Sequence, residues 1–137
     1  MVLGKNQFVE RRRKNFKYLK EALSDLEDKL ILPEACPGAN PSWIGFPLTC
    51  REGVDKNSLV QHIEKEGVQT RMLFAGNLIR QPCFDEMREE GTGYRVINNL
   101  QTTDRIMERT FWIGVYPGMD EEKLRDMTKI IHGYFSN

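Results

Sequence analysis

The stretch VQTRMLFAGNLIRQPCF, residues 68–84, joins a strand-like pattern to a polar loop. Its first seven residues alternate between two sides of an extended chain, which is the period of a half-buried strand. Gly76 interrupts this pattern, and because it has no Cβ its backbone can adopt a positive φ or let a ligand or another chain approach closely. The donor-rich side chains of Asn77, Arg80 and Gln81 follow. Polar groups at the end of a strand are a common setting for a binding site.

The N-terminal part of the sequence predicts one long helix. Apolar residues recur at spacings of three, four or eight over residues 5–29, which indicates an amphipathic helix of about seven turns. Pro33 is expected to end it. We therefore expect a single domain, 1–137, with a connecting helix over 1–32 and a sheet-and-helix unit over 41–137.

The rest of the chain alternates between strands and helices. Strands are expected at residues 44–50, 68–74 and 111–116, and Pro47 indicates an edge position or a bulge in the first of them. Four helices are expected. The first begins at an Asp55 cap and stops at Gly67, and a second, short one follows Pro82. The third runs from Thr102 or Thr103 to Glu108, and the fourth begins at an Asp120 cap. Within the polar segment of residues 85–99, a mobile loop is expected after the short helix that follows Pro82.

This order predicts an α/β (α+β) sandwich. We expect a small, mostly antiparallel three-stranded sheet with helices on one face, preceded by the long N-terminal helix. The uncovered face of the sheet would then be the working or docking face. The aromatic residues Trp43, Phe46, Phe111 and Trp112 fit a core or an interface of such a sheet better than a base-stacking role.

Composition excludes several broad classes of protein. Twenty basic and twenty acidic side chains cancel, which argues against a nucleic-acid or membrane-surface protein. The basic run at residues 11–14 is read as a solvated helix face. No apolar run approaches the roughly 20 residues of a spanning helix, and residues 1–4 are too short for a signal peptide, so a cytoplasmic location is expected.

Residues 68–82 resemble a known pattern, I-x-T-R-x-L-F-A-G-N-L-x-R-Q-P, with Val68 at its first position. The pattern is that of the C-terminal domain of the DegT/DnrJ/EryC1/StrS sugar aminotransferase family. Four further segments agree in the same order, namely residues 12–19, 41–47, 103–107 and 110–118. The resemblance is closest to the branch of CDP-4-keto-6-deoxyglucose 3-dehydrases, which contribute to the 3,6-dideoxyhexoses of bacterial O-antigens. The family's enzymes are several times longer, so the match corresponds to their small domain.

The resemblance implies a fold type I pyridoxal-phosphate enzyme whose catalytic residues lie in a missing large domain. The whole enzyme would use pyridoxamine or pyridoxal phosphate and a [2Fe-2S] cluster to remove the C3 hydroxyl of a 4-keto-6-deoxy CDP-sugar. This chain alone is expected to be inactive and to bind no cofactor. Its expected partners are the large domain or a partner subunit, and a homo-oligomer is expected.

The same resemblance gives a set of site residues. Phe74, Gly76, Asn77 and Arg80 would line the nucleotide-sugar or cofactor pocket. Further candidates for substrate contact are Arg71 and Arg105. Arg71 could equally form a surface ion pair or join Arg80 and Asn77 in an anion site. Asp104-Arg105 could simply stabilise the beginning of a helix.

Other reactive side chains form no recognisable motif. His62 and His132 are expected to be exposed and not catalytic, since neither has a Cys or Ser partner at a known spacing. The three cysteines, Cys36, Cys50 and Cys83, lie far apart and are expected to be reduced thiols that bind no metal. No dinucleotide, P-loop or zinc-protease motif is present.

Two other functions fit the same residues. A sugar aminotransferase of the same family is one, although members with that activity carry a His-containing sequence where this chain has Phe-Ala-Gly-Asn-Leu. The other is an interaction module that has kept the small-domain fold and lost catalysis.

Overall fold

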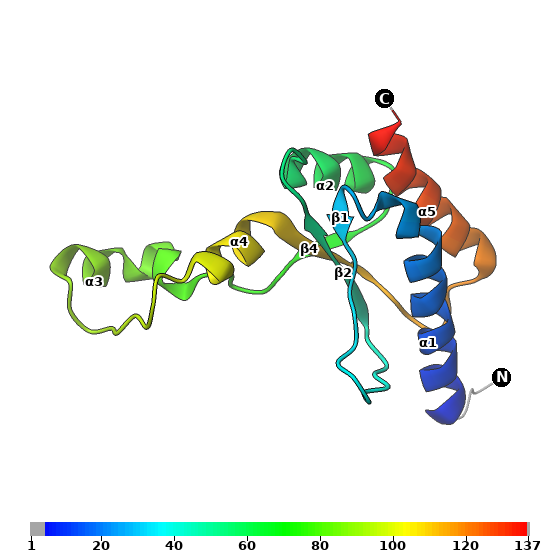
Figure 1. Cartoon of the computed structure of the whole chain (residues 1–137), viewed down its shortest axis with the longest axis horizontal. Helices are drawn as coiled ribbons and strands as arrows, with labels where there is room; N and C mark the ends of the chain where they lie inside the picture. Colours follow the sequence, from blue (N-terminus) through cyan, green and yellow to red (C-terminus); the bar gives the residue numbers. More distant parts are fainter. Residues whose placement is uncertain (1–4, 137) are drawn as a thin grey trace.

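The computed structural model describes residues 5–136 and contains a four-stranded sheet (Figure 1). The strands, in spatial order, are β1 (Leu30–Ile31), β2 (Gly45–Cys50), β4 (Thr110–Gly114) and β3 (Thr70–Met72). Every neighbouring pair is antiparallel. The three expected strands are therefore confirmed, with β3 shorter than expected, and β1 is a fourth strand that the sequence analysis missed.

The N-terminal helix is shorter than the predicted connecting helix. The first four residues of the predicted 1–32 segment lie outside the described residues, and α1 spans Lys5–Ala22. A 3₁₀ turn, η1 (Ser24–Leu26), then leads into β1. The expectation of a helix to Pro33 was wrong because Leu30 and Leu32 are both buried and stand two residues apart, which is the period of a strand.

Pro47 lies in an inner strand of the sheet, contrary to the expected edge or bulge. The register explains how a residue without an N–H is accommodated there. Pro47 stands opposite Trp112 of β4. The N–H of Val115 donates to the carbonyl of Ile44, and hydrogen-bonded pairs alternate along an antiparallel ladder, so Pro47 is in a non-hydrogen-bonded pair and its nitrogen is directed to the side of β1. The β1 ladder reaches only Thr49, and Pro47 therefore leaves no ladder hydrogen bond unmade.

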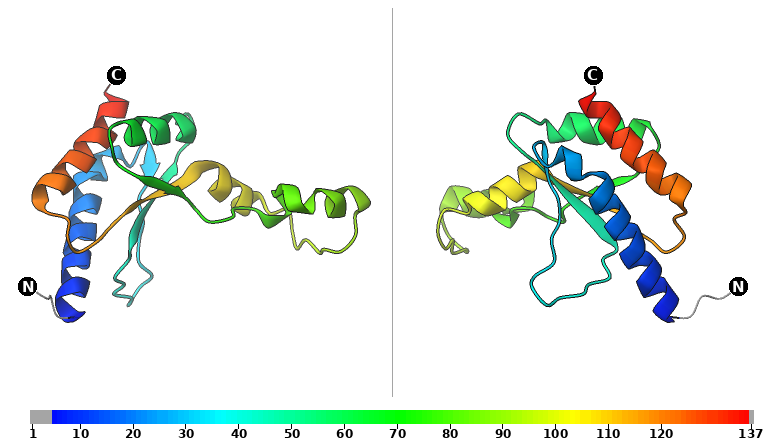
Figure 2. Two further views of the ribbon diagram at one scale, coloured as in Figure 1. Left: turned by 180° about the vertical axis from the view of Figure 1, so that it is seen from behind. Right: turned by 45° about the vertical axis from the view of Figure 1, so that its right-hand side comes forward.

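Three helices cover one face of the sheet, as predicted. They are α1, α2 (Lys56–Lys65) and α5 (Glu121–Phe135), and Figures 1 and 2 show them together on one side of the strands. One core joins them to the sheet, with Leu19, Ile63 and Ile131 fully buried against Phe46 and Phe111.

Two of the expected helix caps are confirmed. Asp55 accepts hydrogen bonds from the backbone N–H groups of Asn57 and Ser58, and Asp120 accepts one from that of Lys123. A third expectation fails, because α4 (Gln101–Arg109) begins before Thr102. The side chain of Asn99 accepts a hydrogen bond from the N–H of Gln101 instead.

Residues 73–109 form an arm that projects from one end of the sheet (Figures 1 and 2). The arm contains two 3₁₀ turns, η2 (Leu78–Arg80) and η3 (Pro82–Phe84), followed by α3 (Asp85–Glu90) and α4. Between α3 and α4 the chain has no helix or strand. Helix α4 contacts β2 and β4, whereas α3 packs against η2 and η3. The arm is thus joined to the core mainly through α4.

Candidate functional site

The polar loop of residues 74–81 is fastened to α4 by a carboxylate. Asn77, which is only 3% exposed, donates its side-chain N–H to Oδ1 of Asp104 at 2.7 Å. Arg80 donates to Oδ2 of the same carboxylate at 2.7 Å. A second acidic side chain, Glu108, lies 3.6 Å from the Arg80 guanidinium. Two residues predicted for the site, Asn77 and Arg80, are therefore brought together on Asp104.

Asp104 is a residue whose part in this arrangement the sequence analysis missed. It was expected only to favour the beginning of a helix, and it does lie in the first turn of α4, but its carboxylate also accepts hydrogen bonds from Asn77 and Arg80. Its side chain is 19% exposed, whereas that of Arg80 is 51% exposed. The available signal was the spacing: Asp104 and Glu108 stand four residues apart on one helix face and can together meet a cation.

Gly76 brings the loop backbone close to α4. Its φ is +63°, a region that favours glycine. A Cβ at this position would overlap the side chain of Met107. The N–H of the following residue, Asn77, donates to Met107 Sδ at 3.3 Å. The positive φ expected at Gly76 is confirmed, and the close neighbour in this structure is Met107 on α4 of the same chain.

The remaining predicted site residues lie apart from this carboxylate. Phe74 is 88% exposed, and Arg105 is exposed on α4. Arg71 is exposed on β3 opposite Trp112. Among the described residues Arg71 has no ion-pair partner, so the surface ion pair that the sequence left open is not formed within residues 5–136.

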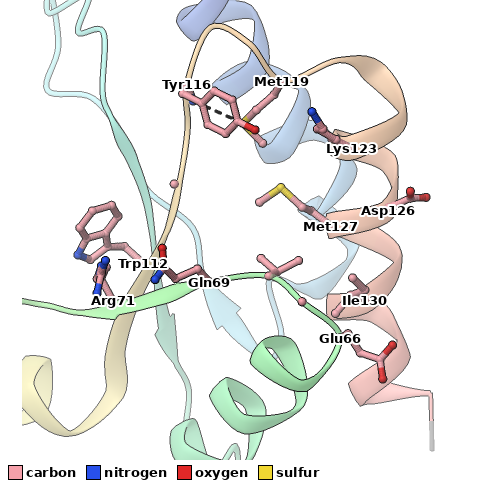
Figure 3. A pocket seen from close by; sticks show the side chains of 13 residues that line it. Glu66, Gln69, Arg71, Trp112, Tyr116, Met119, Lys123, Asp126, Met127 and Ile130 are labelled. Carbon is pink, nitrogen blue, oxygen red and sulfur yellow. Dashed lines mark hydrogen bonds between the residues drawn. The ribbon is translucent and has the colours of Figure 1, made fainter.

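Arg71 borders a cleft between the β3–β4 edge and α5 (Figure 3). The cleft has a volume of about 650 Å³ and receives Tyr116, Met127 and Lys123 from its other sides. Arg71 and the Trp112 indole lie together at one end of it. Trp112 covers Gly45, where a Cβ would come within 2.5 Å of the ring. Of the six predicted site residues, only Arg71 lines this cleft.

The histidines occupy contacts between elements and are half-buried, so the expectation that they are exposed was wrong. His62 on α2 is hydrogen-bonded to the carbonyl of Ile130 on α5 at 3.0 Å. His132 on α5 contacts Asp25 at 3.0 Å and the Thr128 carbonyl at 2.7 Å. Burial alone would lower the pKa of His132, but its hydrogen bonds to these two oxygens outweigh burial and raise the pKa.

The cysteines differ in exposure. Cys36 and Cys83 are exposed free thiols, whereas Cys50 is buried in β2. Burial raises the pKa of the Cys50 thiol to about 11, an effect that Lys56 partly offsets. Within the described residues no three His, Cys, Asp or Glu side chains lie close enough together to hold a metal ion. No helix among those residues has the length and apolar character needed to cross a membrane.

Comparison with known proteins relates the chain to enzymes of sugar metabolism. A model of the DegT/DnrJ/EryC1/StrS aminotransferase family matches residues 4–132. The lipopolysaccharide biosynthesis protein RfbH of Salmonella typhimurium is 49% identical over 120 residues, which are 86% of this chain and 26% of RfbH. The dTDP-4-dehydro-2,6-dideoxy-D-glucose 3-dehydratase of Saccharopolyspora spinosa is 40% identical over 119 residues, covering 85% of this chain and 24% of that enzyme. The chain thus spans about a quarter of the length of these relatives.

Solved structures share the fold at lower identity. The E. coli GDP-4-keto-6-deoxy-D-mannose-3-dehydratase with bound hydrated PLP superposes with a TM-score of 0.76 at 20% identity, over 92% of this chain and 31% of that chain. The aminotransferase TlmJ of Streptoalloteichus hindustanus gives a TM-score of 0.78 at 17% identity, over 96% of this chain and 32% of that chain. Both a dehydratase and an aminotransferase therefore contain this fold as about one third of a longer chain.

Proposed function

Because the chain belongs to the DegT/DnrJ/EryC1/StrS aminotransferase family, we propose that it is the C-terminal domain of a nucleotide-sugar 3-dehydratase. The whole enzyme would depend on pyridoxamine or pyridoxal phosphate and act on a CDP-sugar in 3,6-dideoxyhexose and lipopolysaccharide biosynthesis, in the cytoplasm. The observation that carries this proposal is the pair of curated relatives, of which one is a named 3-dehydratase and the other a lipopolysaccharide biosynthesis protein. Alone, the chain is inactive.

Residues 5–136 do not supply a cofactor centre by themselves. The polar side chains of Asn77 and Arg80 are already paired with Asp104, so they are not free donors for a cofactor phosphate. A [2Fe-2S] cluster needs four ligands, usually thiolates, and within the described residues no three His, Cys, Asp or Glu side chains lie close enough together to hold a metal. We therefore assign cofactor binding and the catalytic groups to the large domain, and we derive no chemical step from this chain.

The contribution of this chain would be to shape the substrate side of the site. We propose that the 74–81 loop, held by Asp104, forms part of the wall of the nucleotide-sugar pocket. In this arrangement Phe74 and Arg105 reach the ligand, and Gly76, Asn77 and Arg80 fix the path of the loop. The exposure of Phe74 and Arg105, and the pairing of Asn77 and Arg80 inside the arm, support this division of roles. Arg71 would contact the ligand from the neighbouring cleft.

A sugar aminotransferase is the second candidate. Its support is the fold, since TlmJ contains the same unit at a similar TM-score. The 3-dehydratase is favoured because the likeness to TlmJ is only 17% identity, whereas the likeness to the curated 3-dehydratase is 40%. The third candidate, an interaction module without catalysis, predicts that no large domain can make the chain part of an active enzyme.

The test is a domain exchange in the 3-dehydratase of S. spinosa. This chain replaces the region that it matches, and loss of the C3 hydroxyl from dTDP-4-dehydro-2,6-dideoxy-D-glucose is followed against the parent enzyme. We expect a folded chimera that retains measurable dehydration, and no turnover by the isolated chain. A chimera that folds and binds pyridoxal phosphate but is inactive would contradict the proposal and favour the interaction module.

A further inference from the structure

The arm is linked to the rest of the chain by very few polar contacts. In the described part of the chain, Lys56 donates the only side-chain hydrogen bond between the arm and the core, and the other side-chain hydrogen bonds of the arm stay within it. Nζ of Lys56 lies 2.9 Å from the carbonyl oxygen of Met107. An ion pair of Arg109 with Glu52 spans 3.9 Å, but the Glu52 side chain is 93% exposed. Lys56 therefore provides the main polar link between arm and core.

The acceptor of this hydrogen bond lies at the C-terminal end of α4. The last four carbonyl groups of an α-helix have no intrahelical donor and form the negative end of the helix dipole. The carbonyl of Met107 is one of them, because α4 ends at Arg109. The chain then enters β4 directly at Thr110 (Figure 1). An ammonium group at this carbonyl satisfies a free acceptor and holds the junction between the arm and the sheet.

The donor stands on a fixed part of the core, at a position that its own helix does not favour. Lys56 is the first residue of α2, directly after the Asp55 cap, and the buried side chains of Leu59 and Ile63 fasten this helix to the core. A cation in the first turn opposes the helix dipole. Among the described residues, Lys56 forms no ion pair that would offset this cost. A residue that is locally unfavourable often serves a purpose elsewhere in the structure.

Met107 is also the residue against which the 74–81 loop packs. Gly76 lies directly against its side chain, and the N–H of Asn77 donates to its sulfur at 3.3 Å. The carboxylate that binds the same loop lies one turn earlier on α4. The backbone of Met107 thus accepts from Lys56 while its side chain contacts the loop. A single residue therefore connects α2 of the core with the candidate site.

We propose that Lys56 is a positioning residue for the candidate site. Its ammonium group fixes α4 to α2, and α4 carries the 74–81 loop, so the loop is held at a defined place relative to the sheet. Asp104 holds the loop on α4, and Lys56 holds α4 on the core. The importance of Lys56 to the site rests on the proposed function, in which the loop forms part of the wall of the nucleotide-sugar pocket.

The first test measures the position of the arm in the isolated chain. Cys83 on the arm and Cys36 between β1 and β2 are exposed thiols, whereas Cys50 is buried, so nitroxide spin labels can be attached to the two exposed thiols without new cysteines. Lys56→Met removes the ammonium group and keeps an unbranched side chain. The matched control is Lys65→Met, because Lys65 is exposed on the same helix.

The distribution of distances between the labels, measured by pulsed electron paramagnetic resonance, should broaden or shift in Lys56→Met and stay unchanged in Lys65→Met. A displaced arm should become roughly tenfold more populated, which is the factor that one hydrogen bond from a charged group supplies. Identical distributions in the two variants would overturn the proposal.

Native-state hydrogen exchange separates positioning from general stabilisation of the arm. The amide of Asn77 should exchange at nearly the parent rate in Lys56→Met, because the contacts of the loop with α4 remain. Replacing Asp104 with alanine should accelerate exchange of the same amide. Equal acceleration in the two variants would overturn the proposal, since Lys56 would then stabilise the arm without positioning it.

The second test asks whether the position of the arm matters to the site. Lys56→Met and Lys65→Met are placed in a chimera in which this chain replaces the matching region of the S. spinosa 3-dehydratase. Lys56→Met should raise KM for dTDP-4-dehydro-2,6-dideoxy-D-glucose by up to about tenfold and change kcat little, because the loop would contribute binding and no chemical step. Lys65→Met should change neither constant.

The outcomes distinguish this role from the proposed function. A lower kcat with an unchanged KM, or no change in either constant, would overturn Lys56 as a positioning residue for the site. A chimera that is inactive with the unaltered chain would count against the proposed function alone. The distances between the labels would then still support or overturn Lys56 as the residue that places the loop.

Discussion

Replacing Asp104 with alanine is expected to release the 74–81 loop from α4. The carboxylate accepts two hydrogen bonds, from Asn77 and from Arg80, each 2.7 Å long. The two donors differ in the free energy that it costs to leave each of them without the carboxylate. Arg80 is half exposed and can bond to water, so its loss costs about 0–1 kcal/mol, as for surface ion pairs. Asn77 is buried, and leaving its amide without an acceptor costs about 1–3 kcal/mol.

These magnitudes give an order for three single substitutions. Asp104→Ala should destabilise the arm by about 2–3 kcal/mol, since it affects both donors. Asn77→Ala should cost somewhat less and Arg80→Ala least. In the double variant Asp104→Ala with Asn77→Ala, the two costs should not add, because the residues share one hydrogen bond.

Native-state hydrogen exchange is the suitable assay because the arm can open without unfolding of the core. Amides over residues 76–81 and 103–109 should exchange roughly 30- to 140-fold faster in Asp104→Ala, at tenfold for each 1.4 kcal/mol. Amides of Phe46 and Ile113 in the core should be unchanged. An Arg80→Ala variant that matches or exceeds Asp104→Ala would refute the reasoning that burial of Asn77 dominates.

Three further predictions concern other parts of the chain. Gly76→Ala should destabilise the arm more than Gly91→Ala in the same exchange assay, because both glycines have a positive φ but only Gly76 would direct a Cβ into Met107; equal effects would show that the contact is unimportant. The pair of His132 and Asp25 should stabilise the fold most between the ordinary pKa values of 3.8 and 6.5, because their hydrogen bond raises the pKa of His132 and lowers that of Asp25. Its contribution to stability should be lost as pH rises through the raised pKa of His132 or falls through the lowered pKa of Asp25. Urea unfolding measured over a pH series would contradict this if Asp25→Asn left the pH dependence of stability unchanged. Among the thiols, Cys36 and Cys83 should react with a disulfide reagent in the native protein and Cys50 only after denaturation, a result that three fast thiols would exclude.

Local signals in the sequence predicted much of the fold. The caps at Asp55 and Asp120 follow from side chains that bond to backbone within three residues, so they can be read without tertiary information. The change from helix to strand at Leu30 could have been read from the spacing of two between Leu30 and Leu32. The position of Pro47 could not, because it depends on where the ladder of a partner strand ends.

The sequence predicted where in the chain the candidate site lies but not how its side chains are paired. The loop after β3 and the positive φ of Gly76 were expected from the sequence, and both are found. The pairing of Asn77 and Arg80 with Asp104 joins residues 27 and 24 positions apart, and no local pattern specifies it. The arm as a whole was also not predicted, because its projection from the sheet depends on tertiary packing, which the hydrophobic periodicity of the sequence does not specify.

The exchange of this chain into two host enzymes tests the central claim most directly. The hosts are the 3-dehydratase of S. spinosa and the aminotransferase TlmJ, and the quantity measured is the fraction of each parent's kcat/KM that its chimera retains. If the chain is the small domain of a 3-dehydratase, the dehydratase chimera should retain a measurably larger fraction than the TlmJ chimera. A larger fraction in the TlmJ chimera would contradict the account and assign the chain to an aminotransferase.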